Sequence, residues 1–88
     1  MKTIRWTAHA RKRVALREVS IEEVEQTLTQ PDSIVAGHPP RRVFMRRYFD
    51  DVLDAEMLMR VVAEETDVEM AVITFYKTSK FKKYEGGT

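Results

Sequence analysis

Residues 20–36 read SIEEVEQTLTQPDSIVA, and the spacing of their apolar side chains changes at Pro31. Before the proline, Ile21, Val24 and Leu28 recur at intervals of three and four residues, which places them on one face of an α-helix. Proline has no amide hydrogen and clashes with the preceding turn, so the helix is predicted to end there. After Pro31 the helical spacing stops, and we expect strands.

Two helices are predicted before Pro31. Ser20 followed by Glu23 matches the capping box that starts the second helix. The segment 7–19, TAHARKRVALREV, is rich in good helix formers, and Thr7 can cap its first turn. A short β-like stretch, residues 4–6, precedes it.

The rest of the chain is predicted to form strands at residues 33–37, 41–49, 56–65 and 68–76, with a hairpin-like turn before the last one. The predicted fold class is therefore α+β, with two N-terminal helices packed on one face of a three- to four-stranded antiparallel sheet. The other face of the sheet would stay at least partly open.

Composition predicts one small domain, residues 1–88, in the cytoplasm. The chain has 88 residues, 43% of them hydrophobic, and no apolar run close to the ~20 residues that span a bilayer. Its N-terminus has no apolar secretion segment. The absence of cysteine excludes disulfides and zinc–thiolate sites, and we expect no metal and no cofactor.

Charge is segregated although the formal net charge is only +1. Basic residues cluster at 11–17, 41–47 and 77–83, whereas acidic residues gather in the segments between them. Clusters of this kind set a local potential. They indicate either an anion-binding surface or three ordinary solvated stretches.

Alternation along the predicted strands sorts their side chains into two faces. Met57, Met59, Val61 and Ala63, together with Val43, Met45 and Phe49, are predicted to face the helices. The open face is then predicted to carry basic and aromatic side chains: Arg42, Arg46, Tyr48, Arg60 and Tyr76.

The first predicted helix carries His9, Arg13 and Arg17 at successive four-residue steps, which places them on one stripe. Histidine can gain or lose a proton near neutral pH, and guanidinium groups beside it favour an anionic ligand. A solvated basic helix with an incidental histidine is the alternative.

The C-terminal segment 76–84, YKTSKFKKY, combines lysines with tyrosines and hydroxyl groups. Lysines neutralise phosphates and tyrosines stack on unpaired bases, so the segment suits RNA. Protection of a sheet edge is the alternative, and it explains Lys82 and Lys83 well.

Taken together, His9, Ala10 and Arg13, the Pro31-Asp32 stop and the YKTSK segment resemble a prokaryotic family of domains of unknown function. The order of elements is also similar to that of RelE and BrnT toxins. The resemblance implies a metal-independent endoribonuclease that cuts mRNA, on the ribosome or free, and that is held by a cognate antitoxin.

In this interpretation a base and an acid move protons while cations stabilise the phosphorane. His9 is the candidate base or acid, and Arg13, Arg46 and Arg60 would hold the phosphate. Tyr76 or Lys80 would orient the reacting groups or supply a proton. The candidate RNA-binding residues are Arg17, Arg42, Tyr48, Lys77, Lys82 and Lys83. A non-catalytic module that binds nucleic acid or a protein partner, or a purely structural interaction domain, explains the same pattern.

Overall fold

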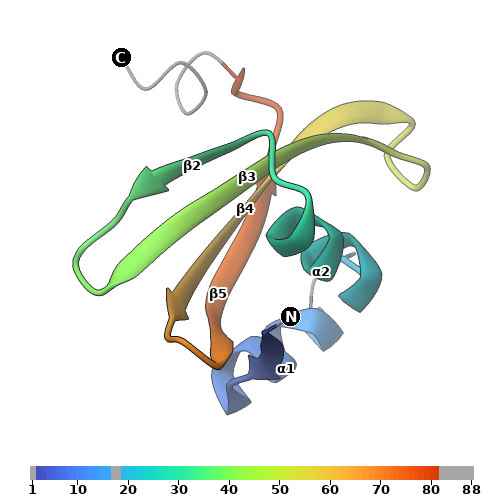
Figure 1. The fold of residues 1–88 in the computed structure, drawn as a ribbon. Coiled ribbons are helices and arrows are strands. Elements are labelled where there is room, and N and C mark those ends of the chain that lie inside the picture. Colours follow the sequence, from blue (N-terminus) through green and yellow to red (C-terminus); the bar gives the residue numbers. More distant parts are fainter. Residues whose placement is uncertain (1, 17–18, 82–88) are drawn as a thin grey trace.

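The computed structural model describes residues 2–16 and 19–81, which form two helices and five strands (Figure 1). In chain order the elements are β1 (Thr3–Trp6), α1 (Ala8–Leu16), α2 (Ile21–Thr29), β2 (Ser33–Ala36), β3 (Arg41–Asp50), β4 (Ala55–Glu65) and β5 (Glu69–Thr78). The α+β class and the two N-terminal helices are confirmed.

The five described strands form one mixed sheet in the order β1-β5-β4-β3-β2. β2 to β5 pair antiparallel with their neighbours, as predicted, but β1 adds a strand that runs parallel to β5. The prediction of three or four purely antiparallel strands was therefore wrong. β1 pairs with the far end of the chain, and no local pattern in residues 3–6 indicates that partner.

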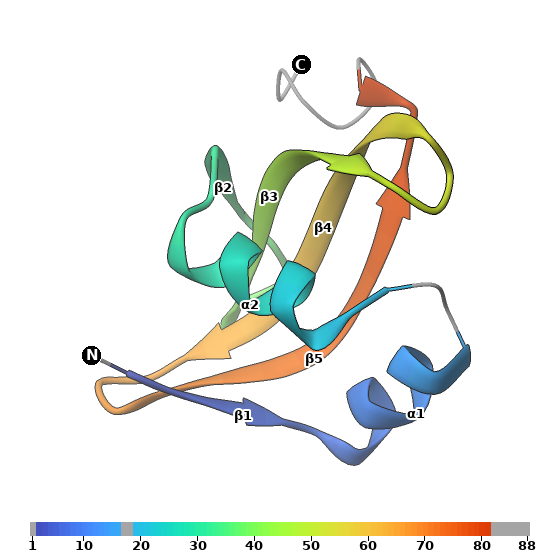
Figure 2. The ribbon, with the colours of Figure 1, turned by 90° about the vertical axis from the view of Figure 1, so that its right-hand side faces the viewer.

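Both helices lie on the same side of the sheet (Figure 2). Ala10 of α1 and Val24 and Leu28 of α2 pack into one buried cluster with sheet residues that include Val61 and Phe75. Burial of this apolar surface is the main stabilising contribution to such a fold. No described helix is long and apolar enough to cross a bilayer.

Local hydrogen bonds explain where each helix begins. The backbone N–H of Ala10 donates to Thr7 Oγ1 over 3.2 Å, while the Thr7 hydroxyl donates to the carbonyl of Val72 over 2.7 Å. Thr7 thus caps α1 and ties it to β5. The predicted capping box of α2 is present, with Ser20 and Glu23 each accepting the other's backbone N–H.

The predicted orientation of β3 was wrong. Val43 and Met45 pack with Leu58 in a second, smaller cluster, on the face of the sheet away from the helices. Phe44 instead joins the main core beneath the helices. Residues 43–45 are all buried, so this segment is apolar on both faces and alternation cannot tell which face meets the helices.

The reversed orientation moves three predicted open-face residues. Directly paired residues in a sheet share a face, and Arg42 pairs with Ala63 and Arg46 with Met59, both on the helix side. Tyr48 packs against the same core. Arg42, Arg46 and Tyr48 therefore lie on the helix side, not on the open face.

A β-bulge in β5 changes which of its side chains point toward the helices. Val61 pairs with Phe75, but Ala63 pairs with Val72, so one extra residue of β5 lies between the two pairs. Val72 and Phe75 consequently both belong to the core beneath the helices. Without the extra residue, strict alternation along β5 would place Val72 and Phe75 on opposite faces.

Candidate functional site

The six predicted catalytic residues do not gather in one place. Arg60 and Tyr76 are direct neighbours on the open face, where the guanidinium donates to the tyrosine hydroxyl and lies 5.4 Å from its ring centroid. His9 and Arg13 lie on α1, on the other side of the sheet. A catalytic site needs its groups in one concavity, and the sheet separates these two pairs.

The remaining two members of that set also lie apart. Arg46 Nη1 donates to the backbone carbonyl of Gln30 over 2.7 Å, at the C-terminal end of α2. Lys80 follows β5 and is exposed, with its backbone N–H bound to Thr78 Oγ1. The catalytic roles of these residues stay predictions.

Of the predicted RNA-binding residues, Arg17, Lys82 and Lys83 lie outside the described residues. Arg42 forms an ion pair with Glu65 and lies over the ring of Phe44, 5.4 Å from its centroid. These contacts occupy its guanidinium within the molecule.

Tyr48 and Lys77 belong to a buried polar cluster. Lys77 Nζ donates to Asp50 Oδ2 over 2.6 Å, and the Tyr48 hydroxyl donates to the same oxygen over 3.2 Å. The bond from Lys77 holds the pKa of Asp50 below its usual value. Burial raises the pKa of Tyr48, and the carboxylates of Glu23 and Asp50 raise it further.

Asp50 also organises the turn that follows β3. Its Oδ1 accepts the backbone N–H groups of Val52 and Leu53 over 3.0 and 3.1 Å. The cluster of Asp50, Lys77 and Tyr48 thus holds the end of the sheet together. Sequence reasoning gave Asp50 no such role, because its lysine partner is on another strand.

Ion pairs neutralise many of the cationic side chains outside α1. Arg5 pairs with Glu69 and Arg47 with Glu56. Further pairs join Lys2 and Arg42 to Glu65, Arg41 to Glu64 and Lys77 to Asp50.

α1 carries three consecutive cations that ion pairs do not neutralise. Within the described part of the chain, the side chains of Arg11, Lys12 and Arg13 make no ion pair and no hydrogen bond. Arg11 and Lys12 are exposed, whereas Nε of Arg13 is buried without a hydrogen-bond partner. Arg46 and Lys80 also have no carboxylate partner among the described residues, but only α1 carries three such cations in succession within the described part of the chain.

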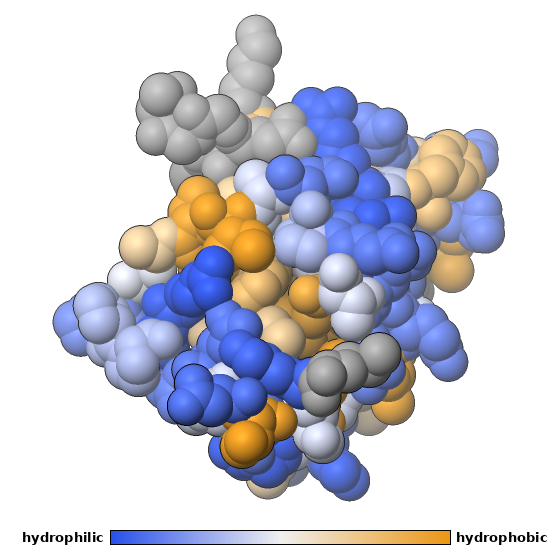
Figure 3. Space-filling model, in the orientation of Figure 1, coloured by the Kyte–Doolittle hydropathy of each residue, from blue (hydrophilic) through white to orange (hydrophobic). Residues whose placement is uncertain are grey.

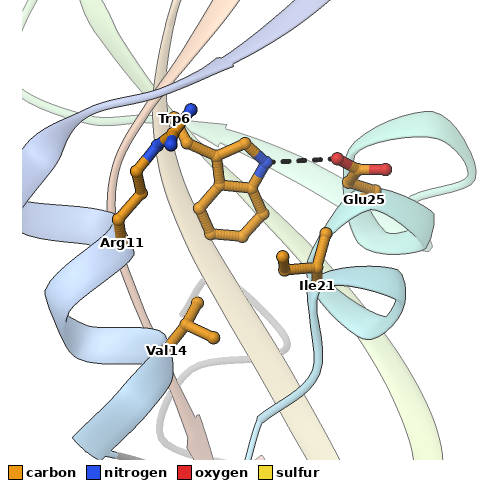
Figure 4. A pocket seen from close by; sticks show the side chains of 5 residues that line it. All are labelled: Trp6, Arg11, Val14, Ile21 and Glu25. Atoms are coloured by element: carbon orange, nitrogen blue, oxygen red, sulfur yellow. Dashed lines mark hydrogen bonds between the residues drawn. The ribbon is translucent and has the colours of Figure 1, made fainter.

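A cleft of about 430 Å³ lies beside α1, between it and α2 (Figure 4). Its lining residues are Trp6, Arg11, Val14, Ile21 and Glu25. Trp6 Nε1 donates to Glu25 Oε2 over 3.1 Å, and the indole meets the ring of Phe75 edge to face, with centroids 6.0 Å apart. Sequence reasoning missed this cleft, because its lining comes from three separate elements.

Arginine side chains of the sheet also lie over aromatic rings, Arg60 over Tyr76 and Arg47 over Phe81. Figure 3 shows hydrophilic residues dividing the hydrophobic surface of one side into separate patches. Among residues 2–16 and 19–81, no group of three or more histidine, aspartate or glutamate side chains is arranged to hold a metal ion.

Comparison with known proteins identifies a family. The sequence profile of a domain of unknown function, DUF4258, matches residues 6–77 and agrees with the predicted resemblance to an uncharacterised domain family. No curated protein and no solved structure matches the chain significantly. The further similarity to RelE and BrnT toxins stays a prediction.

Proposed function

We propose that this chain, which belongs to the DUF4258 family, is a module that binds single-stranded RNA by holding its phosphate backbone on α1. The observation that carries the proposal is the uncompensated charge of Arg11, Lys12 and Arg13. Cations that are not already paired within the protein are the ones available to replace counterions on phosphates.

The half-buried Arg13 adds a structural reason. A buried guanidinium N–H without a partner is unfavourable, so the Arg13 side chain can turn toward solvent and donate to a phosphate oxygen without giving up a hydrogen bond of its Nε. An anion on this helix would therefore stabilise an arrangement that the isolated protein leaves incomplete.

The acidic character of α2 argues for a single strand over a duplex. A helix-turn-helix reader inserts its second helix into the major groove, but the first turn of α2 carries Glu22 and Glu23. Their carboxylates would face the phosphates of a duplex at close range, at a cost in free energy. A flexible single strand can follow α1 and avoid α2.

The test compares two variants with the same reduction of charge. Replacement of Arg11, Lys12 and Arg13 by glutamine should weaken binding of a fluorescent single-stranded RNA, measured by anisotropy. For each phosphate that the variant no longer neutralises, the slope of log affinity against log salt should become shallower by about 0.7. Circular dichroism checks that the variants are folded.

The matched control replaces Arg5, Arg41 and Arg47 by glutamine, since each of these exposed arginines already has a carboxylate partner. It should bind RNA nearly as tightly as the wild type. Equal weakening by both triple variants would show a bulk charge effect and contradict the assignment to α1.

A metal-independent endoribonuclease, a toxin like RelE and BrnT with a cognate antitoxin, is the second candidate. The observation that favours it is His9, which is exposed one turn before Arg13 on the same helix. A phosphate on Arg13 would lie beside the imidazole, which could take the proton of the 2′-hydroxyl or protonate the leaving 5′-oxygen.

His9→Ala should then slow cleavage of purified mRNA, with or without ribosomes, by about 10²- to 10⁴-fold. His38→Ala, which removes an exposed loop histidine, is the matched control and should cleave like the wild type. Chelation of divalent metal should change nothing. Equal inertness of wild type and His9→Ala, on RNA and in a growth-arrest assay, would remove this candidate and leave the binding module.

A further inference from the structure

We infer that the cleft between α1 and α2 holds one unstacked base of the bound RNA against the indole of Trp6, an inference that rests on the proposed function. Base stacking on aromatic rings and a cationic track for phosphates recur together in proteins that bind single strands. The cleft and the free cations of α1 are neighbours, because Arg11 belongs to both.

The geometry of the cleft suits a flat aromatic ligand. Figure 4 shows the indole face framed by four side chains, with Arg11 and Val14 of α1 on one side and Ile21 and Glu25 of α2 on the other. A ligand that enters between them would lie on the ring face and contact apolar side chains at its edges.

The indole is held in this orientation before any ligand binds. Its Nε1 is fixed by the hydrogen bond to Glu25, and Phe75 packs against it at an interplanar angle of 76°. A ring that is already positioned loses little conformational freedom on binding. Trp6 therefore has the features of a preorganised stacking platform.

The charged residues at the rim of the cleft determine how the base and the phosphates of the RNA would be oriented. Glu25 would repel a phosphate on the α2 side, whereas Arg11 would attract one on the α1 side, where Lys12 and Arg13 follow. The base would enter the cleft, and the backbone would lie over α1. At about 430 Å³ the cleft is within the usual range of small-ligand sites.

Trp6 is the single tryptophan of the sequence, so its fluorescence reports on the cleft alone. Titration with a short single-stranded RNA should quench this emission. The control ligand is an abasic oligonucleotide of equal length, which offers the phosphates without the bases. It should bind more weakly and leave the emission unchanged.

A variant separates stacking from charge. Trp6→Leu should lower the affinity for the base-containing RNA by about 5- to 150-fold, the range for removal of one stacked base, and should leave affinity for the abasic ligand unchanged. Phe49→Leu, at an exposed phenylalanine outside the cleft, is the matched control. If Trp6→Leu does not fold, the titrations of the wild type with the RNA and with the abasic oligonucleotide still test the base site.

The outcomes distinguish the two proposals. Equal binding of both ligands, with no change in emission, would overturn the base site and leave the phosphate-binding function standing. Failure of both ligands to bind would overturn the proposed function and this inference with it. Quenching by the RNA alone, with base-dependent affinity, would support both.

Discussion

Asp50 is 3% exposed, and its carboxylate accepts hydrogen bonds from Lys77, Tyr48 and two backbone N–H groups of the following turn. Asp50→Asn would keep an acceptor for the turn but remove the Asp50 counter-charge from the largely buried ammonium of Lys77. Removal of one partner of a buried pair costs about 3–5 kcal/mol. We expect a decrease of this size in the free energy of unfolding, measured by urea denaturation.

The double variant Asp50→Asn/Lys77→Met should recover more than half of that decrease, because methionine removes the ammonium that Asp50 no longer balances and still fills the site. Glu56→Gln, which breaks the exposed pair with Arg47, should cost less than about 1 kcal/mol. If the double variant is less stable than Asp50→Asn alone, the charge of Lys77 is not the cause of the lost stability.

At the scale of elements, sequence patterns located the helices and most strands because those signals are local. Ser20 and Glu23 satisfy each other's backbone groups within one turn, so the capping box could be read directly from their spacing. The β4 segment has good helix formers, yet its alternating Met57, Met59 and Val61 correctly indicated a strand with one face in the core.

Features that depend on distant partners could not be predicted in this way. β1 pairs with β5 across most of the chain, and the extra residue in β5 is visible only from its pairing with β4. The orientation of β3 is decided by whether Phe44 or Met45 fills the space under the helices. Tertiary packing decides such cases, since either register buries apolar surface.

In the candidate site, too, local features could be predicted from the sequence and features that depend on distant partners could not. The basic composition of α1 was evident from the sequence, but its importance depends on ion pairs that neutralise other arginines, such as Arg41 with Glu64 on a neighbouring strand. Arg60 and Tyr76 were correctly placed together on the open face. Their separation from His9 could be recognised only from the arrangement of layers (Figures 1 and 2).

For the whole molecule, the perturbed ionisations predict a stability that decreases at both ends of the pH scale. The pKa of Asp50 is lowered chiefly by Lys77 and that of Glu65 chiefly by Lys2, so the folded state favours both carboxylates in their charged form. Their contribution is complete above the unfolded pKa values of about 4 and is lost as the pH falls through the folded values.

Tyr48 acts in the opposite direction. Its pKa is raised by burial and by two carboxylates, so the folded state favours the neutral phenol. Its contribution is complete below the unfolded pKa of about 10 and is lost as the pH rises above that value.

Urea denaturation across pH 2–11 should therefore give a plateau of stability between about pH 5 and 9. On the alkaline side, the free energy of unfolding of Tyr48→Phe should decrease less than that of the wild type. On the acid side, the free energy of unfolding of Glu65→Gln should decrease less than that of the wild type. Curves for both variants that run parallel to the wild type would show that these groups do not set the limits.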